Sequence, residues 1–127
     1  MANSFTRLAV VGVAAATMLT VTASPALAAD QNRTLSNSHG KMTYNDSVDV
    51  FEICDTRADG HGVSGGLTRW YQSAHIQYKE NAFTINDGGD AGCDKIGYDV
   101  KGYPNNYAMY FKWDGGGATQ STQWFSE

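Results

Sequence analysis

From residue 39 onward, apolar and polar positions alternate along the chain with a period of two, which is the repeat of a β-strand. The clearest example is residues 107–113 (YAMYFKW), where Tyr107, Met109, Phe111 and Trp113 occupy every second position. Beyond residue 28, no stretch spaces its apolar residues as a helix does over three turns. The pattern therefore predicts an all-β domain without a substantial helix.

Further strands are predicted where short runs rich in β-branched and aromatic residues stand between turn-forming clusters. These runs are residues 47–54, 63–72, 74–79, 96–101 and 119–125, with a short piece at 83–85. The clusters of Gly, Asn, Asp and Pro between them lie at residues 59–60, 86–89, 104–106 and 114–117. The connections are too short for the crossover helices of a parallel sheet. We therefore expect a small antiparallel β-sandwich, with a small β-barrel as the alternative.

The first 28 residues have the three parts of a secretory signal peptide. Arg7 supplies a positive charge, residues 8–21 form an uncharged apolar run, and residues 26–28 (ALA) match the cleavage signal. The run is shorter than the roughly 20 residues of a membrane-spanning helix, although a retained membrane anchor is the alternative. We expect an exported protein with a flexible lead over residues 29–38 and a single domain over residues 39–127.

The charge of the chain limits the classes of partner. Its formal net charge is −4 at pH 7, and its basic residues form no stripe or long run. Binding to nucleic acid or to an anionic membrane surface depends on clustered Lys and Arg. We therefore expect an extracellular protein or a glycan as partner, and neither nucleic acid nor, after removal of the signal peptide, a membrane.

The sequence contains two cysteines, Cys54 and Cys93. In an oxidising compartment they have a single intramolecular pairing, so the sequence predicts a Cys54–Cys93 disulfide. Such a bond closes a loop of about 40 residues and contributes roughly 4 kcal/mol in the chain-entropy model. Two free thiols or an intermolecular bridge are the alternatives.

Residues 62–66 (GVSGG) have the Gly-x-Ser-x-Gly spacing of a nucleophile elbow. That motif needs a helix directly after the serine, but Ser64 is followed by two glycines and then by Trp70 and Tyr71 within the same predicted strand. Val63 stands where chymotrypsin-like proteases have an aspartate. The sequence also lacks the His-Glu-x-x-His, Cys-x-x-Cys and P-loop signatures. We therefore expect no catalytic residue and no enzyme, with a small hydrolase as the alternative.

Aspartates gather in the loops that the predicted disulfide brings together. Carboxylates and backbone carbonyls from Gly-rich loops are the oxygen ligands that Ca²⁺ takes, so a weak calcium site is one hypothesis. The alternative is that these side chains cap turns by accepting hydrogen bonds from nearby backbone N–H groups. No other cofactor is expected. The candidate calcium ligands are Asp55, Asp59, Asp87, Asp90 and Asp94.

The chain has three tryptophans and seven tyrosines, more than the core of a small sandwich needs. Exposed aromatic rings stack on sugars or anchor protein partners, whereas the alternative is that they fill the core and its rim. The candidate ligand-binding residues are Trp70, Tyr71, Tyr103, Tyr107, Trp113 and Trp124.

Residues 50–63 (VFEICDTRADGHGV) carry a turn of the form Asp-x-x-Ala-Asp-Gly-His. With the signal peptide and the late second cysteine, this stretch resembles a group of small secreted β-rich proteins of actinobacteria whose function is uncharacterised. The resemblance implies export and a β-rich fold, and it brings no activity and no catalytic residues. Many proteins of that group have more cysteines than this chain.

The sequence thus predicts a secreted, non-catalytic binding module whose ligand class stays open. A protein or cell-surface partner is the first hypothesis, and a carbohydrate or cell-wall ligand is the second. Inhibition of an extracellular protease is the third, and residues 101–108 (KGYPNNYA) would then supply the inhibitory loop.

Overall fold

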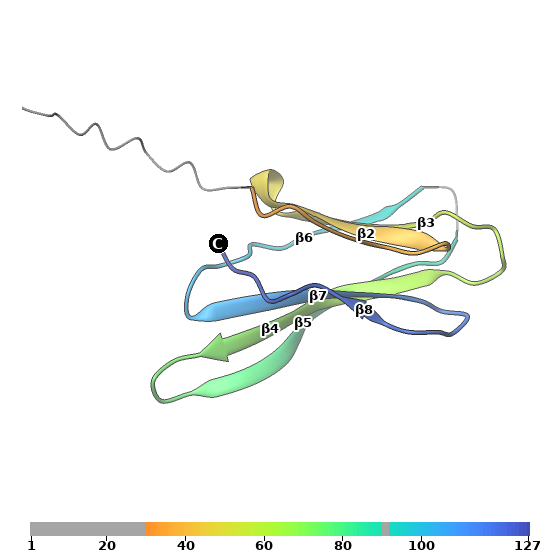
Figure 1. The fold of residues 1–127 in the computed structure, drawn as a ribbon. Coiled ribbons are helices and arrows are strands. Elements are labelled where there is room, and N and C mark those ends of the chain that lie inside the picture. The colour runs from red at the N-terminus through yellow and green to blue at the C-terminus, as the bar shows by residue number, and fades with distance from the viewer. Residues whose placement is uncertain (1–29, 90–91) are drawn as a thin grey trace, which may run out of the picture.

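A computed structural model describes residues 30–89 and 92–127, so the predicted signal peptide lies outside the described residues. Two antiparallel four-stranded sheets stack face to face (Figure 1). The first sheet has the order β1-β2-β3-β6, formed by Arg33–Ser36, Gly40–Asn45, Val50–Asp55 and Asp94–Gly97. The second sheet has the order β5-β4-β7-β8, formed by Gln77–Asp87, Val63–Gln72, Asn105–Trp113 and Gln120–Ser121. The prediction of a small antiparallel sandwich is confirmed, and the sheets do not close into a barrel.

The core lies between the sheets and is built from the inward positions of the alternating strands. Tyr44 stacks on Phe51 with 4.4 Å between the ring centroids, and these rings are buried. Each such large apolar side chain contributes roughly 1.5–3 kcal/mol by leaving water. The other buried apolar residues are Met42, Ile53, Val63, Leu67, Val100, Tyr107, Met109, Phe111 and Phe125. The period of two predicted from the sequence is therefore the period of this core.

Gly65 allows the two sheets to approach closely at the centre of the sandwich. A Cβ atom at this position would lie 2.6 Å from Met42 Sδ and 2.8 Å from the Tyr110 carbonyl oxygen. Because both distances are shorter than van der Waals contact, only glycine fits here without a shift of its neighbours.

Residues 29–38 were expected to form a flexible lead, but Arg33–Ser36 form the edge strand β1. Its residues pair with β2 from Arg33↔Tyr44 to Ser36↔Lys41, and Leu35 packs against the core. A short edge strand that contributes one apolar side chain leaves no periodic signal in the sequence. The strand β2 that it pairs with was also not singled out from the sequence.

Local side-chain hydrogen bonds shift two predicted strand starts. The Asn45 side chain accepts a hydrogen bond from the Ser47 backbone N–H (3.2 Å) and caps a 3₁₀ turn at Asp46–Val48, so β3 begins at Val50. Ser73 Oγ likewise accepts from the Ile76 N–H (3.1 Å) and holds the turn between β4 and β5, so β5 begins at Gln77. In Figure 1 the hairpin of β4 and β5 extends past the strands of the first sheet.

Within the described residues, no helix is both long enough and apolar enough to cross a membrane.

Candidate functional site

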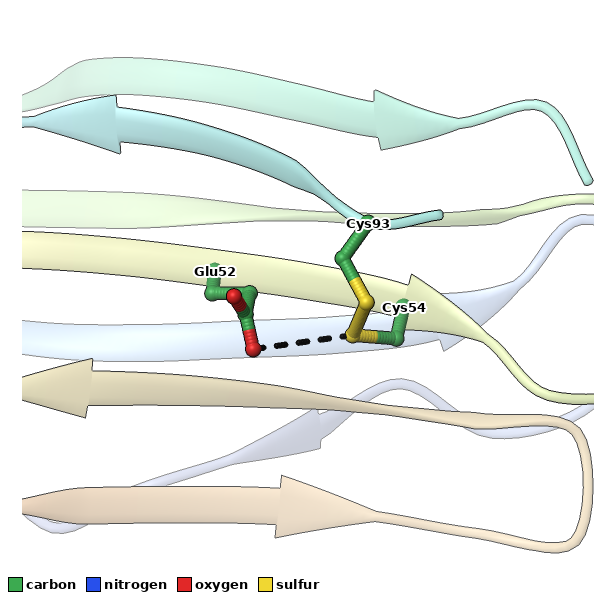
Figure 2. A group of neighbouring side chains, drawn as sticks. All are labelled: Glu52, Cys54 and Cys93. Carbon is green, nitrogen blue, oxygen red and sulfur yellow. Dashed lines mark hydrogen bonds between the residues drawn. A yellow bond between two sulfur atoms is a disulfide. The ribbon is translucent and has the colours of Figure 1, made fainter. Parts of the chain in front are cut away.

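The predicted disulfide is present between Cys54, near the end of β3, and Cys93, just before β6 (Figure 2). The two Cα atoms are 4.4 Å apart. A Glu52 carboxylate oxygen lies 3.8 Å from Cys54 Sγ, and the same carboxylate pairs with Lys95 at 2.8 Å. Glu52, Cys54 and Cys93 are the one group in the described residues whose ligand atoms gather closely enough for a metal. Metal ligation by cysteine requires a thiolate, so the intact disulfide leaves only the Glu52 carboxylate to ligate.

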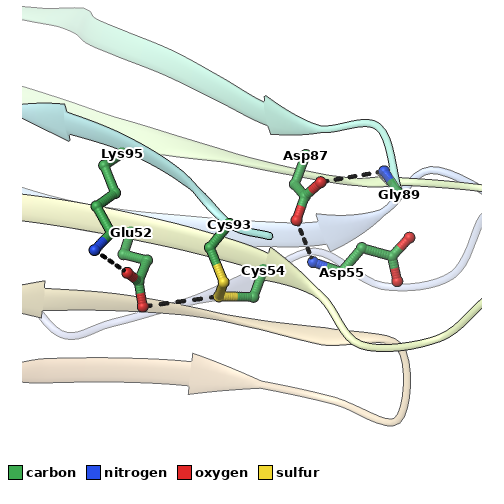
Figure 3. Close-up of a disulfide and its surroundings, with 7 residues drawn as sticks. All are labelled: Glu52, Cys54, Asp55, Asp87, Gly89, Cys93 and Lys95. Atoms are coloured by element: carbon green, nitrogen blue, oxygen red, sulfur yellow. Dashed lines mark hydrogen bonds and ion pairs between the residues drawn. A yellow bond between two sulfur atoms is a disulfide. The ribbon is translucent and has the colours of Figure 1, made fainter. Parts of the chain in front are cut away.

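Asp87 connects the two sheets beside this disulfide (Figure 3). Its side chain is fully buried at the end of β5, and its Oδ2 accepts a hydrogen bond from the Asp55 N–H (2.7 Å) at the end of β3. Its Oδ1 accepts from the Gly89 N–H (3.1 Å). Both carboxylate oxygens are thus used by the backbone, as turn-capping aspartates use theirs.

The other predicted calcium ligands do not join Asp87 in one cluster of carboxylates. Asp55 Oδ1 accepts from the Arg57 N–H (2.8 Å), Asp94 is exposed on β6, and Asp90 lies outside the described residues. In the described part of the chain, no three of these aspartates bring carboxylate oxygens within 4.8 Å of one another. The calcium site therefore stays a prediction. The carboxylates of Asp55, Asp59 and Asp87 accept hydrogen bonds from nearby backbone N–H groups, as the turn-capping alternative expects.

Asp59 belongs to a separate cluster with two histidines and Trp113. Its Oδ2 lies 2.7 Å from His39 Nδ1, and its Oδ1 accepts from the His61 N–H (3.1 Å). Desolvation acts to raise the pKa of Asp59, but the hydrogen bonds from His39 and His61, with the nearby Trp113 indole, lower that pKa overall. His39 stacks on Trp113 with 4.0 Å between the centroids, and the His61 ring meets the same indole edge-on at 5.3 Å. This cluster closes one end of the sandwich.

An open groove of about 430 Å³ adjoins that cluster. Trp113 and His39 form part of its wall, and the remainder is Asn37, Gln120 and the loop of residues 115–118. A Cβ atom on Gly115 would lie 2.1 Å from the Trp113 ring, so the glycine lets the loop fold over the indole.

The predicted ligand-binding aromatics fall into three environments. Tyr107 is fully buried in the core and therefore cannot form part of a surface, contrary to the expectation. Tyr103 is the most exposed, at 85% of its full accessible area, and Trp113 is half-buried between histidines. The remaining three candidates lie at the far end of the second sheet, and they are Trp70, Tyr71 and Trp124.

Trp70 and Trp124 meet edge-on at this end, with 5.7 Å between the centroids and an interplanar angle of 60°. The ammonium group of Lys79 lies 5.0 Å from the Trp70 centroid and 5.3 Å from the Trp124 centroid. On the opposite face of the hairpin, Tyr71 stacks on Tyr78 at 5.2 Å. The hairpin therefore carries aromatic side chains on both of its faces.

The outer face of the second sheet, turned away from the first sheet, carries a network of bonded polar side chains. Ser64 on β4 donates a hydrogen bond to Asp114 Oδ1 (2.6 Å). Asn86 on β5 donates from Nδ2 to Ser64 Oγ (2.7 Å) and to Asp114 Oδ2 (2.8 Å). The serine of the GVSGG motif thus belongs to an exposed polar triad, and no histidine is among its hydrogen-bond partners.

Tyr110 lies across the middle of the same face. Its hydroxyl group is 3.1 Å from Thr84 Oγ1 on β5, so the side chain reaches from β7 over the intervening strand β4. Gly66 of β4 makes this possible, because a Cβ atom there would lie 2.5 Å from the hydroxyl oxygen and 2.7 Å from the ring. The aromatic ring is therefore laid along the sheet instead of pointing away from it.

Asn81 lies next to Thr84 on this face, at a β-bulge where the β4–β5 register shifts between Leu67 and Thr68. In the orientation that satisfies both ends of its amide, Nδ2 donates to the carbonyl oxygens of Leu67 (3.2 Å) and Phe83 (3.0 Å). Its Oδ1 then accepts from Thr84 Oγ1 (2.8 Å). The side chain thus bonds to backbone carbonyls of both strands at the bulge.

We call this surface the outer face: the polar triad of Ser64, Asn86 and Asp114, the Tyr110 ring with Thr84 and Asn81, and the Trp70, Trp124 and Lys79 cluster. Six residues of this surface were not predicted from the sequence as candidates: Tyr110, Asn86, Asp114, Lys79, Thr84 and Asn81. One signal was available, because Gly66 interrupts a predicted strand and such a glycine marks a close approach.

Comparison with protein-family models, with curated proteins and with solved structures finds no match to this chain. The function is therefore inferred from its own residues and their geometry.

Proposed function

We propose that this protein is an exported, non-catalytic binding module whose ligand is a glycan chain lying along the outer face. The observation that carries the proposal is the Tyr110 ring, which lies along the sheet over Gly66 between a bonded polar triad and an indole pair. A ring in this orientation offers its flat side to a ligand, and sugar rings stack on such surfaces through their C–H groups.

The polar part of the outer face suits the hydroxyl groups of sugars. The Ser64 hydroxyl hydrogen and both Asn86 amide hydrogens are used within the triad, so the Asp114 carboxylate and Asn86 Oδ1 offer acceptors to the hydroxyl groups of a sugar. Because these side chains already bind one another at 2.6–2.8 Å, they are held in place before a ligand arrives. Such preorganisation lowers the entropic cost of binding.

The length of the outer face favours a chain over a single sugar. Ser64 and Trp70 lie on the same side of β4, six positions apart, which corresponds to about 20 Å at the usual rise of a strand. Trp70 and Trp124 are not coplanar, so the proposal assigns the central stacking role to Tyr110 and an end contact to Trp124, which is 41% exposed.

Export is part of the proposal. The Cys54–Cys93 disulfide is typical of oxidising compartments. The features of a signal peptide in residues 1–28 and the resemblance to small secreted actinobacterial proteins support the same location.

The other hypotheses have less support from the described residues. Of the expected inhibitory loop, residues 105–108 belong to β7 and pair with β4, which leaves only residues 101–104 outside a strand. A protein partner that docks on the aromatic hairpin is the principal alternative, and the experiment below tests for it.

The test is retention of the purified protein on chitin, cellulose, xylan and bacterial cell wall, with a panel of secreted proteins and proteases in parallel. Retention on at least one glycan is expected, and Tyr110→Ala should weaken it about tenfold, whereas Tyr110→Phe keeps the ring and most of the binding. Tyr103→Ala is the matched control, because Tyr103 is an exposed tyrosine that precedes β7 and is not among the residues that define the outer face. Retention on no glycan, or binding of a protein instead, would contradict the proposal.

A further inference from the structure

Lys79 is an uncompensated cation at the aromatic end of the outer face. Its ammonium group lies over the Trp70 and Trp124 rings, and in the described part of the chain no carboxylate comes within the 4.0 Å of an ion pair with it. The neighbouring Glu80 is paired with Arg69 on the opposite face of the hairpin. The positions directly opposite Trp70 in the two neighbouring strands are Lys79 itself and Asn106, so no acidic residue faces this site across the sheet.

The two indoles hold Lys79 in one place. A cation over an aromatic face is stabilised by the ring quadrupole, and here one ammonium group contacts two rings at 5.0 and 5.3 Å. This contact uses one side of the ammonium group and leaves its other donors toward solvent, because Lys79 is exposed. An anion can therefore pair with Lys79 while the ring that carries the anion lies against the exposed part of Trp124.

The opposite end of the outer face has different chemistry. The carboxylate there, that of Asp114, accepts hydrogen bonds from Ser64 and Asn86, and the triad suits the hydroxyl groups of a sugar. The outer face thus has one end where a cation lies on two indole rings, and another end, about 20 Å away along β4, where the polar triad lies beside Lys112 without such a ring contact.

This inference rests on the proposed function. We propose that the ligand is an acidic glycan, that the carboxylate of one of its sugars pairs with Lys79, and that the ring of the same sugar packs on Trp124. The chain carries a net charge of −4, so long-range attraction does not draw in a polyanion. Recognition instead depends on one local ion pair, and binding should fall only slightly with added salt.

The experiment compares polygalacturonate, alginate and hyaluronan, each as the free carboxylate and as its methyl ester, by affinity electrophoresis at 0.15 M salt. An exposed ion pair predicts about a three- to fivefold preference for the carboxylate form. Lys79→Gln should abolish that preference, and Lys79→Arg should keep it. Lys112→Gln is the matched control, because Lys112 lies opposite Ser64 at the other end of the outer face and its loss changes the net charge equally.

Equal binding of carboxylate and ester, no binding of either form, or an unchanged preference in Lys79→Gln would overturn the inference. A preference lost equally in Lys112→Gln would also overturn it, because the effect would then follow net charge. These outcomes are separable from the proposed function, which is decided by retention on any glycan of the full panel, acidic or neutral, and by its loss in Tyr110→Ala. Binding of an acidic peptide in place of every polysaccharide would overturn both.

Discussion

The outer faces of the two sheets differ in how their side chains are connected. On the first sheet, Thr43, Asn45, Val50, Glu52 and Lys95 line a shallow hollow of about 340 Å³ with the exposed Val48. Among them, the Glu52–Lys95 pair is the one side-chain bond found in the described residues. On the second sheet, Ser64, Asn86 and Asp114 bond to one another, and Tyr110 extends over a strand to reach Thr84.

Both sheets contribute their inward-facing side chains to the same core, so the fold requires those residues of each sheet. The cross-bonded outer face of the second sheet takes no part in that core, and the first sheet has no such face in the described residues. The reinforcing contacts lie elsewhere, at the disulfide of the first sheet and at the Asp87 contact between the sheets. Under the proposed function, the sandwich is stabilised at one place and would bind its ligand at another.

The disulfide gives the largest expected effect. Replacing both cysteines with alanine should lower the free energy of unfolding by about 4 kcal/mol, because the unfolded chain gains the entropy of an open loop with a sequence separation of 39 residues. Urea unfolding of the double variant and the parent measures this loss. Glycan retention by the protein that is still folded should be unchanged, since the outer face lies on the other sheet. Loss of retention in folded protein would show that the two regions are coupled.

The Asp87 contact comes next. Asp87→Ala leaves the Asp55 and Gly89 N–H groups without their carboxylate and should cost about 2–4 kcal/mol. Equilibrium unfolding measures the cost, with Asp94→Ala as a control because Asp94 is exposed on β6. If added Ca²⁺ stabilised the parent and not Asp87→Ala, the calcium hypothesis would gain support over turn capping.

Gly65 and Gly66 test the inner and outer sides of the same strand. An added methyl group at either position meets atoms closer than 3.0 Å, so each alanine variant should lose about 1–3 kcal/mol of stability. Only Gly66→Ala displaces the Tyr110 ring, so it alone should lose glycan retention when the variants are compared well below their melting temperatures. Equal retention by both variants would contradict the role assigned to the ring.

Much of the fold could be predicted from the sequence, because the alternation of apolar and polar residues determines which side chains face the core. Tyr107, Met109 and Phe111 are buried as their period-two spacing predicts. The predicted bounds of residues 63–72 coincide with those of β4. The Cys54–Cys93 pairing needed no geometry, since only two cysteines are present. Strand β1 was missed because it contributes little beyond Leu35 to the core.

The candidate site was harder to predict, because it depends on register between strands far apart in sequence. Ser64 meets Asp114 only because Val63 pairs with Trp113, a relation across 50 positions that no local pattern contains. The contact between Trp70 and Trp124 is equally non-local, because it joins side chains that no local pattern in the sequence relates. Knowledge of the register would have shown both.

The smallest expected effect concerns the Asp59 cluster at the end of the sandwich. The pKa of Asp59 is lower in the folded protein than its ordinary value of 3.8, so its carboxylate stabilises the fold above that pH. The stabilisation should disappear as the pH falls through the lowered pKa, because protonation removes the charge that faces His39. Melting temperatures between pH 2 and 7 measure the effect, and Asp59→Asn should flatten this part of the profile while Asp94→Asn does not. Since Asp59 also orients His39 against Trp113, the tryptophan fluorescence should change over the same pH range in the parent and stay constant in Asp59→Asn.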